Sequence, residues 1–120
     1  MSSNIGQIVK DNFPFLKQLA RTRSVRRRKN ILSNATSEQL LSLVEICLNI
    51  VRNSFPLTRR QKYRILPFAG FVRRAARLRT ERGARHTVVQ QGSGLPIGLF
   101  PALLTPIIIE LTKNLFSKNT

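Results

Sequence analysis

Apolar residues recur at helical spacing most clearly in the middle of the chain, over residues 36–52. Val44 and Cys47 lie on one face of the expected helix, and further leucines and isoleucines widen that face until little of the circumference is polar. Thr36 and Gln39 have the three-residue spacing of a capping box, in which a hydroxyl and an amide bond to N–H groups of the first turn. A helix that is apolar over most of its surface needs neighbours on several sides. The sequence therefore predicts a buried central helix.

The segments before this helix are shorter and more polar. Residues 1–12 contain few apolar side chains, so we expect a flexible N-terminus with at most one loose turn. Residues 12–21 have the pattern of a short helix with Pro14 in its first turn, where proline is tolerated. Ser24 is placed to cap a second short helix. The inward side of that helix is expected to carry Val25, Leu32 and the stem of Arg28.

Beyond the central helix the chain turns and becomes strongly basic. Pro56 disfavours a helical conformation at the residue before it, which predicts a turn. Thr58 and Gln61 repeat the capping-box spacing and begin a helix that Pro67 either kinks or separates from the next one. Residues 67–79 place small and aromatic side chains on one side and arginines mostly on the other, which predicts an amphipathic basic helix. One or two further helical turns are expected before the glycines that follow.

The C-terminal quarter of the chain has a different composition. Residues 95–109 contain no charged side chain, and prolines recur at positions 96, 101 and 106. This stretch is shorter than the ~20 residues that span a bilayer as a helix. A short amphipathic helix is expected to begin at Pro106. Three roles stay open for the tail: it covers the helical domain, it binds another protein or other copies of the chain between Leu95 and Phe116, or it lies in a membrane interface.

Together these patterns predict an all-α protein, a small bundle of four or five short helices. We expect a flexible N-terminus over residues 1–12 and a basic helical domain over residues 13–90. A flexible glycine junction with an apolar, proline-rich C-terminal tail is expected over residues 91–120. The length of 120 residues gives room for one domain, and folding of such a chain buries about 60–70% of its unfolded surface.

The charge of the chain indicates the kind of partner. There are 21 Lys and Arg residues against 5 Asp and Glu residues, a formal net charge of +16. Self-repulsion on this scale is relieved by a polyanion, and the preference for arginine favours phosphate, because a guanidinium group contacts two oxygens at once. Two basic blocks bracket the central helix, and a helical hairpin would bring both to one surface. The predicted nucleic-acid-binding residues are Arg21, Arg23, Arg26, Arg27, Arg28, Lys29, Arg59, Arg60, Lys62, Arg64, Arg73, Arg74, Arg77, Arg79, Arg82 and Arg85.

Residues that could carry other chemistry are sparse. Cys47 has no second cysteine for an intramolecular disulfide, and His86 has no cysteine or second histidine with which to share zinc. The five carboxylates form no close pair for general acid–base catalysis, and no nucleophile elbow surrounds a serine. We therefore expect no enzyme activity, no cofactor and no metal. No apolar region of a secretory signal follows Met1, which predicts a reducing, intracellular compartment.

We expect this polyanion to be double-stranded DNA, bound through its phosphate backbone. Neutralising about ten phosphates would make log affinity fall with log salt at a slope of roughly −9, with little dependence on sequence. Stacking on single strands is poorly supported, because Tyr63 is the only tyrosine and there is no tryptophan. Two alternatives stay open. One is a sequence-specific regulator that places residues 67–79 in a major groove, and the other is a minor capsid or membrane-active protein whose apolar tail is the working part.

The junction and the tail carry a resemblance to a known family. An arginine-rich segment, a glycine-containing break and the run LPIGLFPALLTPII together resemble the precursor of adenovirus core protein X (mu). The layout is also similar to small proteins of adintoviruses and Maverick/Polinton elements. The resemblance covers about a quarter of the chain. The matching positions are Gly92, Gly94, Leu95, Pro96, Leu99, Leu103, Leu104 and Pro106.

This resemblance implies both a function and a location. In that family an arginine-rich, DNA-condensing peptide precedes the tail, which implies DNA condensation in a virion core and passage through the host nucleus. The resemblance also implies protease cleavage at Gly92, Ser93 and Gly94, with Gln90 standing where the adenoviral protease prefers an apolar residue. The tail would then anchor the complex to capsid proteins or to other copies, or be released.

Overall fold

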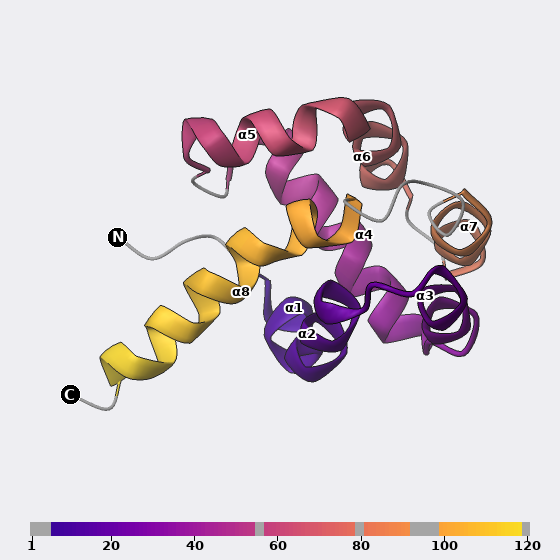
Figure 1. The fold of residues 1–120 in the computed structure, drawn as a ribbon, viewed down its shortest axis with the longest axis horizontal. Helices are drawn as coiled ribbons and strands as arrows, with labels where there is room; N and C mark the ends of the chain where they lie inside the picture. The colour runs from indigo at the N-terminus through magenta and orange to yellow at the C-terminus, as the bar shows by residue number, and fades with distance from the viewer. Residues whose placement is uncertain (1–5, 55–56, 79–80, 92–98, 119–120) are drawn as a thin grey trace.

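The computed structural model describes residues 6–54, 57–78, 81–91 and 99–118, which form helices joined by short turns (Figure 1). No β-strand occurs among these residues, so the predicted all-α class is confirmed. The molecule measures 41 × 28 × 26 Å, with a radius of gyration of 13.5 Å. That radius is typical of one domain of this length.

The described helices outnumber the four or five expected, and the last one is longer than expected. The described elements are α1 (Gln7–Asp11), α2 (Phe13–Arg21), α3 (Val25–Ser33), α4 (Ser37–Val51), α5 (Arg59–Ile65), the 3₁₀ turn η1 (Leu66–Phe68), α6 (Ala69–Ala76), α7 (Glu81–Ala84), the π-helical segment η2 (Arg85–Gln91) and α8 (Leu99–Lys118).

Helix α4 is the predicted central helix. The Thr36 hydroxyl accepts a hydrogen bond from the Gln39 backbone N–H at 3.1 Å, and the Gln39 side-chain oxygen accepts one from the Thr36 N–H at 2.9 Å. The helix packs against α1, α6 and α7, and Leu40, Leu43 and Ile46 are buried. Contacts on several sides explain why nearly its whole circumference is apolar.

The C-terminal end of α4 is closed by an asparagine in the left-handed conformation. Asn53 has φ of 56°, and its N–H donates to the Ile50 carbonyl at 3.2 Å. The Ser54 N–H donates to the Asn49 carbonyl at 2.9 Å. These two bonds form a Schellman motif, in which asparagine takes the place usually held by glycine. The motif ends the helix and turns the chain toward α5.

The N-terminal segment is more ordered than predicted. Helix α1 packs against α4, and Val9 is fully buried. The Asn12 side-chain amide donates to the Ile8 carbonyl at 2.7 Å, where α1 ends. The expectation of a flexible N-terminus is therefore wrong for residues 7–12, because their apolar side chains pack on the core.

Pro67 produces a kink between two helices. The capping box predicted at the start of α5 is present, with bonds of 2.8 and 3.2 Å between Thr58 and Gln61. The 3₁₀ turn η1 then contains Pro67 and joins α5 to α6, since proline has no N–H to donate to an α-helical turn. In α6, Phe71 and Val72 are buried and pack toward α4.

The apolar tail is a helix of the same bundle. Helix α8 begins at Leu99 and continues through Pro106, so the expected start at Pro106 is wrong. An internal proline costs about 3 kcal/mol, whereas full burial of one large apolar side chain contributes about 1.5–3 kcal/mol. Several buried side chains therefore offset it. The buried apolar residues of α8 are Phe100, Leu103, Leu104, Ile107 and Leu111.

Of the three roles left open for the tail, the structure shows the first, in which the tail covers the helical domain. Helix α8 packs against α2 and against α5, and Figure 1 shows it running between α5 and the pair α1–α2. One hydrophobic cluster joins its buried side chains to those of the preceding helices. The described tail therefore belongs to the same core as the basic helical domain.

Candidate nucleic-acid interface

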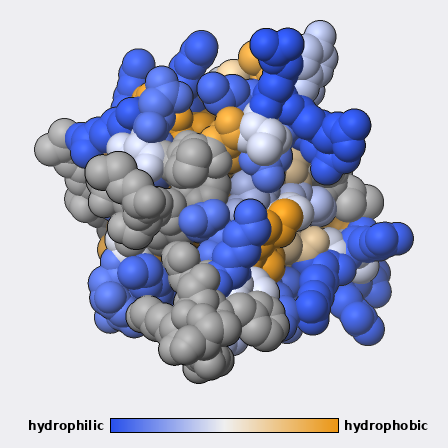
Figure 2. Space-filling view, turned by 90° about the vertical axis from the view of Figure 1, so that its left-hand side faces the viewer, coloured by the Kyte–Doolittle hydropathy of each residue, from blue (hydrophilic) through white to orange (hydrophobic). Residues whose placement is uncertain are grey.

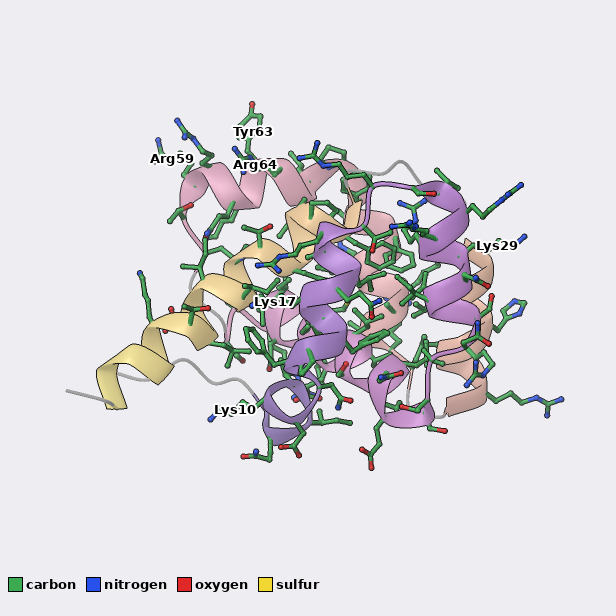
Figure 3. All side chains as sticks on the ribbon, turned by 60° about the horizontal axis from the view of Figure 1, so that its bottom comes forward. Lys10, Lys17, Lys29, Arg59, Tyr63 and Arg64 are labelled. Carbon is green, nitrogen blue, oxygen red and sulfur yellow. The ribbon has the colours of Figure 1, made fainter. Side chains whose placement is uncertain are left out.

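Most cations of the first basic block lie on the surface. Arg21 ends α2, Arg23 lies in the turn, and Arg26, Arg27 and Lys29 lie on α3, all with exposed side chains. Figure 3 shows Lys29 pointing away from the body of the molecule. These five side chains are therefore accessible from solvent, and their binding to nucleic acid stays a prediction.

Helices α2 and α3 border an open groove of about 920 Å³, here called the α2–α3 groove. Its described lining combines four cations with hydroxyl and amide groups, and it includes no carboxylate. Such a lining suits the oxygens of a phosphodiester backbone. The lining residues are Pro14, Lys17, Gln18, Arg21, Thr22, Arg23, Ser24, Arg27, Asn30 and Ile31.

The local sequence explains why cations line this groove. Helix α2 buries Phe15, Leu16 and Leu19, so Lys17 and Arg21, four residues apart, share another side of the helix. On the other wall, Ser24 caps α3, and its hydroxyl accepts a bond from the Arg27 N–H at 3.3 Å. The cap starts α3 directly after the turn and so places Arg27 at its beginning.

Arg28 is the exception in this block, since it is only 2% exposed. Its guanidinium group lies over the Phe100 ring of α8, with the guanidinium carbon 5.6 Å from the ring centroid, a cation–π contact. Burial lowers the pKa of Arg28, but an arginine side chain keeps its charge in proteins. The predicted phosphate contact of Arg28 is therefore wrong for the folded chain, because this charge joins α3 to α8.

Arg85 is a second arginine whose side chain connects two elements of the fold. Its Nη1 donates to the Ser33 carbonyl at 3.3 Å, and its Nη2 donates to the Ala35 carbonyl at 2.9 Å. These carbonyls lie at the C-terminal end of α3, where a positive charge is favourable to the helix dipole. The prediction that Arg85 binds nucleic acid is corrected accordingly: its guanidinium group fastens η2 to the end of α3.

A second basic surface lies on α5 and comprises Arg59, Arg60, Tyr63 and Arg64, which line a shallow depression of about 640 Å³. We call it the α5 surface. Figure 3 shows Arg59, Tyr63 and Arg64 projecting from the same part of α5, away from the body. Tyr63 is 75% exposed. As in the groove, the described lining includes no carboxylate.

The remaining predicted cations are spread over other parts of the molecule. Lys62 on α5, Arg73 and Arg74 on α6, Arg77 after it and Arg82 on α7 are all exposed. Arg79 lies outside the described residues. Figure 2, seen from the side where α5 and the C-terminal part of α8 lie, shows hydrophilic side chains along several edges with smaller hydrophobic patches between them. Exposed cations thus come from α5, α6 and α7 as well as from the first basic block.

The α2–α3 groove and the α5 surface lie on either side of a third helix. Helix α8 packs against both α2 and α5 and lies between them in Figure 1. The α2–α3 groove and the α5 surface are therefore separated by a layer of the core. The two blocks do not meet as a simple helical hairpin: α8 lies between α2 and α5, whereas η2 of the second block packs beside α3.

The sequence prediction of binding residues missed several groove residues, among them Lys17, Gln18 and Asn30. For Lys17 a signal was present, because its four-residue spacing from Arg21 places both on one side of a helix. Gln18 and Asn30 gave no signal, because uncharged polar residues on exposed helices are common.

Cys47 is buried, whereas His86 lies on the surface. Burial raises the pKa of Cys47 to about 12, which keeps it as the unreactive thiol at neutral pH. Within the described residues, no three His, Cys, Asp or Glu side chains come together as a metal site. None of the described helices is both long enough and apolar enough to cross a membrane.

Comparison with known proteins gives no relative: no family model, no curated protein and no solved structure matches the chain. The junction residues Gly92, Ser93 and Gly94, expected to be cleaved, lie outside the described residues.

Proposed function

We propose that this protein binds double-stranded DNA through its phosphate backbone and condenses it, without enzymatic activity and largely without regard to sequence. The observation that carries the proposal is the α2–α3 groove, whose described lining holds four cations and no carboxylate. The net charge of +16 supports binding to any long polyanion, and the α5 surface adds a second group of arginines.

Binding would proceed by replacement of condensed counterions. Each phosphate neutralised by Lys or Arg releases about one cation, so affinity falls as salt rises. The seven cations of the two basic surfaces are Lys17, Arg21, Arg23, Arg27, Arg59, Arg60 and Arg64. If all seven contact phosphates, the slope of log affinity against log salt is roughly −6.

A salt titration of duplex binding by the full chain tests this proposal. We expect a slope of roughly −6 and similar affinities for duplexes of unrelated sequence. The variant R21Q/R23Q/R27Q should have a shallower slope, by about 3 if all three contacts are lost. The matched control K10Q/R52Q/K113Q removes three exposed charges away from both surfaces. A slope near zero, or equal loss of slope in the two variants, would contradict the proposal.

The place of action that we propose is the core of a virion assembled in the host nucleus. This part of the proposal is supported by the resemblance of the tail and junction to the adenovirus core protein precursor. Mass spectrometry of purified particles tests it: we expect peptides of the chain, with a new terminus after Ser93 if the maturation protease acts there. Absence of the chain from DNA-containing particles would contradict it.

The packing of α8 weighs against the alternative of a membrane-active tail. Its side chains Phe100, Leu103 and Leu104 are buried in the core, whereas membrane insertion needs an apolar side that is free to enter lipid. Among the large apolar residues of α8 with a described exposure, Ile109 is exposed, at 43%. One exposed isoleucine offers little apolar area for insertion into lipid. DNA therefore remains the preferred partner.

A further inference from the structure

We infer that one folded copy of the chain holds two DNA segments at once, one in the α2–α3 groove and one on the α5 surface. This inference rests on the proposed function, because it assumes that each surface binds duplex backbone. It adds a mechanism of condensation: the chain joins duplexes directly, in addition to neutralising them.

The α2–α3 groove has the features of a complete backbone site. Lys17 and Arg21 come from one wall, and Arg23 and Arg27 come from the turn and the other wall. Cations on two walls can contact phosphates from both sides of the groove, and the amide of Asn30 adds a neutral hydrogen-bonding group to the lining.

The α5 surface is a second site with the same chemistry. Arg60 and Arg64 are four residues apart and therefore lie on one side of the helix. Arg59 and the exposed Tyr63 have the same spacing and line the same depression. Three guanidinium groups within two helical turns present a compact positive surface, and the phenol of Tyr63 supplies a further donor to phosphate or sugar oxygens.

Helix α8 separates the two sites. Helix α8 packs between α2 and α5 (Figure 1), and the whole molecule measures only 41 × 28 × 26 Å. DNA has a persistence length of about 150 base pairs, so it resists wrapping around a body of this size. We therefore assign a separate DNA segment to each of the two surfaces, from separate duplexes or from distant parts of one.

A capture assay tests this inference. One duplex is fixed to beads, a fluorescent duplex of unrelated sequence is free in solution, and the full-length chain is added. We expect the chain to bring the fluorescent duplex to the beads. Excess protein should reverse the capture, because each duplex then becomes coated by its own copies.

Two triple variants separate the sites. R21Q/R23Q/R27Q removes charge from the groove, and R59Q/R60Q/R64Q removes it from the α5 surface. Each should still bind a single short duplex, with the stoichiometry halved from two duplexes per chain to one, and each should lose capture to background. The control K10Q/R52Q/K113Q should keep both. Circular dichroism and unfolding curves verify that all three variants fold.

The possible failures are distinguishable. If the wild-type chain does not bind duplex at all, the proposed function is wrong. If it binds duplex but captures none, only the two-site inference is wrong. Capture by either single-surface variant would overturn the inference in favour of bridging between associated copies. Complete loss of duplex binding in one variant would overturn it as well, because the other surface would then not be a site.

Discussion

At the scale of single residues, guanidinium groups serve two purposes in this chain. Those of Arg21, Arg27 and Arg59 are exposed on surfaces without carboxylates, whereas those of Arg28 and Arg85 hold helices together. The distinction matters for mutagenesis, because substitutions in the same basic block have different effects: loss of an exposed charge changes binding, and loss of a structural one changes folding.

Arg85 gives the clearest prediction at this scale. Arg85→Gln removes both bonds to the carbonyls at the end of α3, and we expect the free energy of unfolding in urea to fall by about 1–2 kcal/mol. The neighbouring exposed Arg82 supplies the control, since Arg82→Gln should change stability by no more than about 0.5 kcal/mol. Equal effects of the two substitutions would show that the Arg85 bonds do not contribute.

The sequence allowed one of these two structural arginines to be partly predicted. Arg28 precedes Leu32 by four residues, so helical spacing indicated that its stem turns inward. The spacing gave no sign that the guanidinium group itself would be buried against the Phe100 ring of α8. The carbonyl partners of Arg85 lie 50 and 52 positions away, and a pattern read over neighbouring residues contains no information on such a contact.

At the scale of helices, local chemistry was the most reliable guide. The Thr36 and Thr58 capping boxes are bonds within four residues, and both were predicted and are present. The start of α8 was predicted wrongly, because Pro106 is a strong local signal for a helix start. That signal is outweighed by the burial of Phe100 and Leu103, which depends on helices distant in the sequence.

Pro106 therefore gives the prediction at this scale. Pro106→Ala restores a backbone donor and removes a clash worth about 3 kcal/mol, and it loses about 1.6 kcal/mol from two buried methylene groups. We expect a net gain of about 1–2 kcal/mol in the free energy of unfolding. Pro14→Ala is the matched control, because Pro14 lies in the first turn of α2, where proline costs little. A loss of stability in Pro106→Ala would mean that α8 needs the proline for its path.

At the scale of the whole molecule, repulsion among the positive charges destabilises the folded state. A net charge of +16 is held in a body of 41 × 28 × 26 Å. At 0.01 M ionic strength the Debye length is about 30 Å, comparable to the molecule itself, so nearly every pair of charges interacts. Salt and polyanions should therefore stabilise the folded chain.

We accordingly expect opposite effects of sodium chloride on folding and on binding. Raising the salt from 0.01 to 0.15 M shortens the Debye length to about 8 Å; a stabilisation of about 1 kcal/mol would raise the midpoint of thermal unfolding by roughly 4 °C. DNA affinity falls over the same range. In K10Q/R52Q/K113Q, which has three charges fewer, the rise in the midpoint should be smaller. An equal rise in that variant would point to a salt effect other than screening.

The position of α8 in the chain also has a consequence for synthesis. The ribosome makes this helix after all the other described ones, at about 5–20 residues per second. The earlier helices therefore emerge without Leu103, Leu104 and Ile107, which belong to their shared core, and Arg28 emerges before the Phe100 ring that covers it. The shared core can therefore be completed only after α8 has been made.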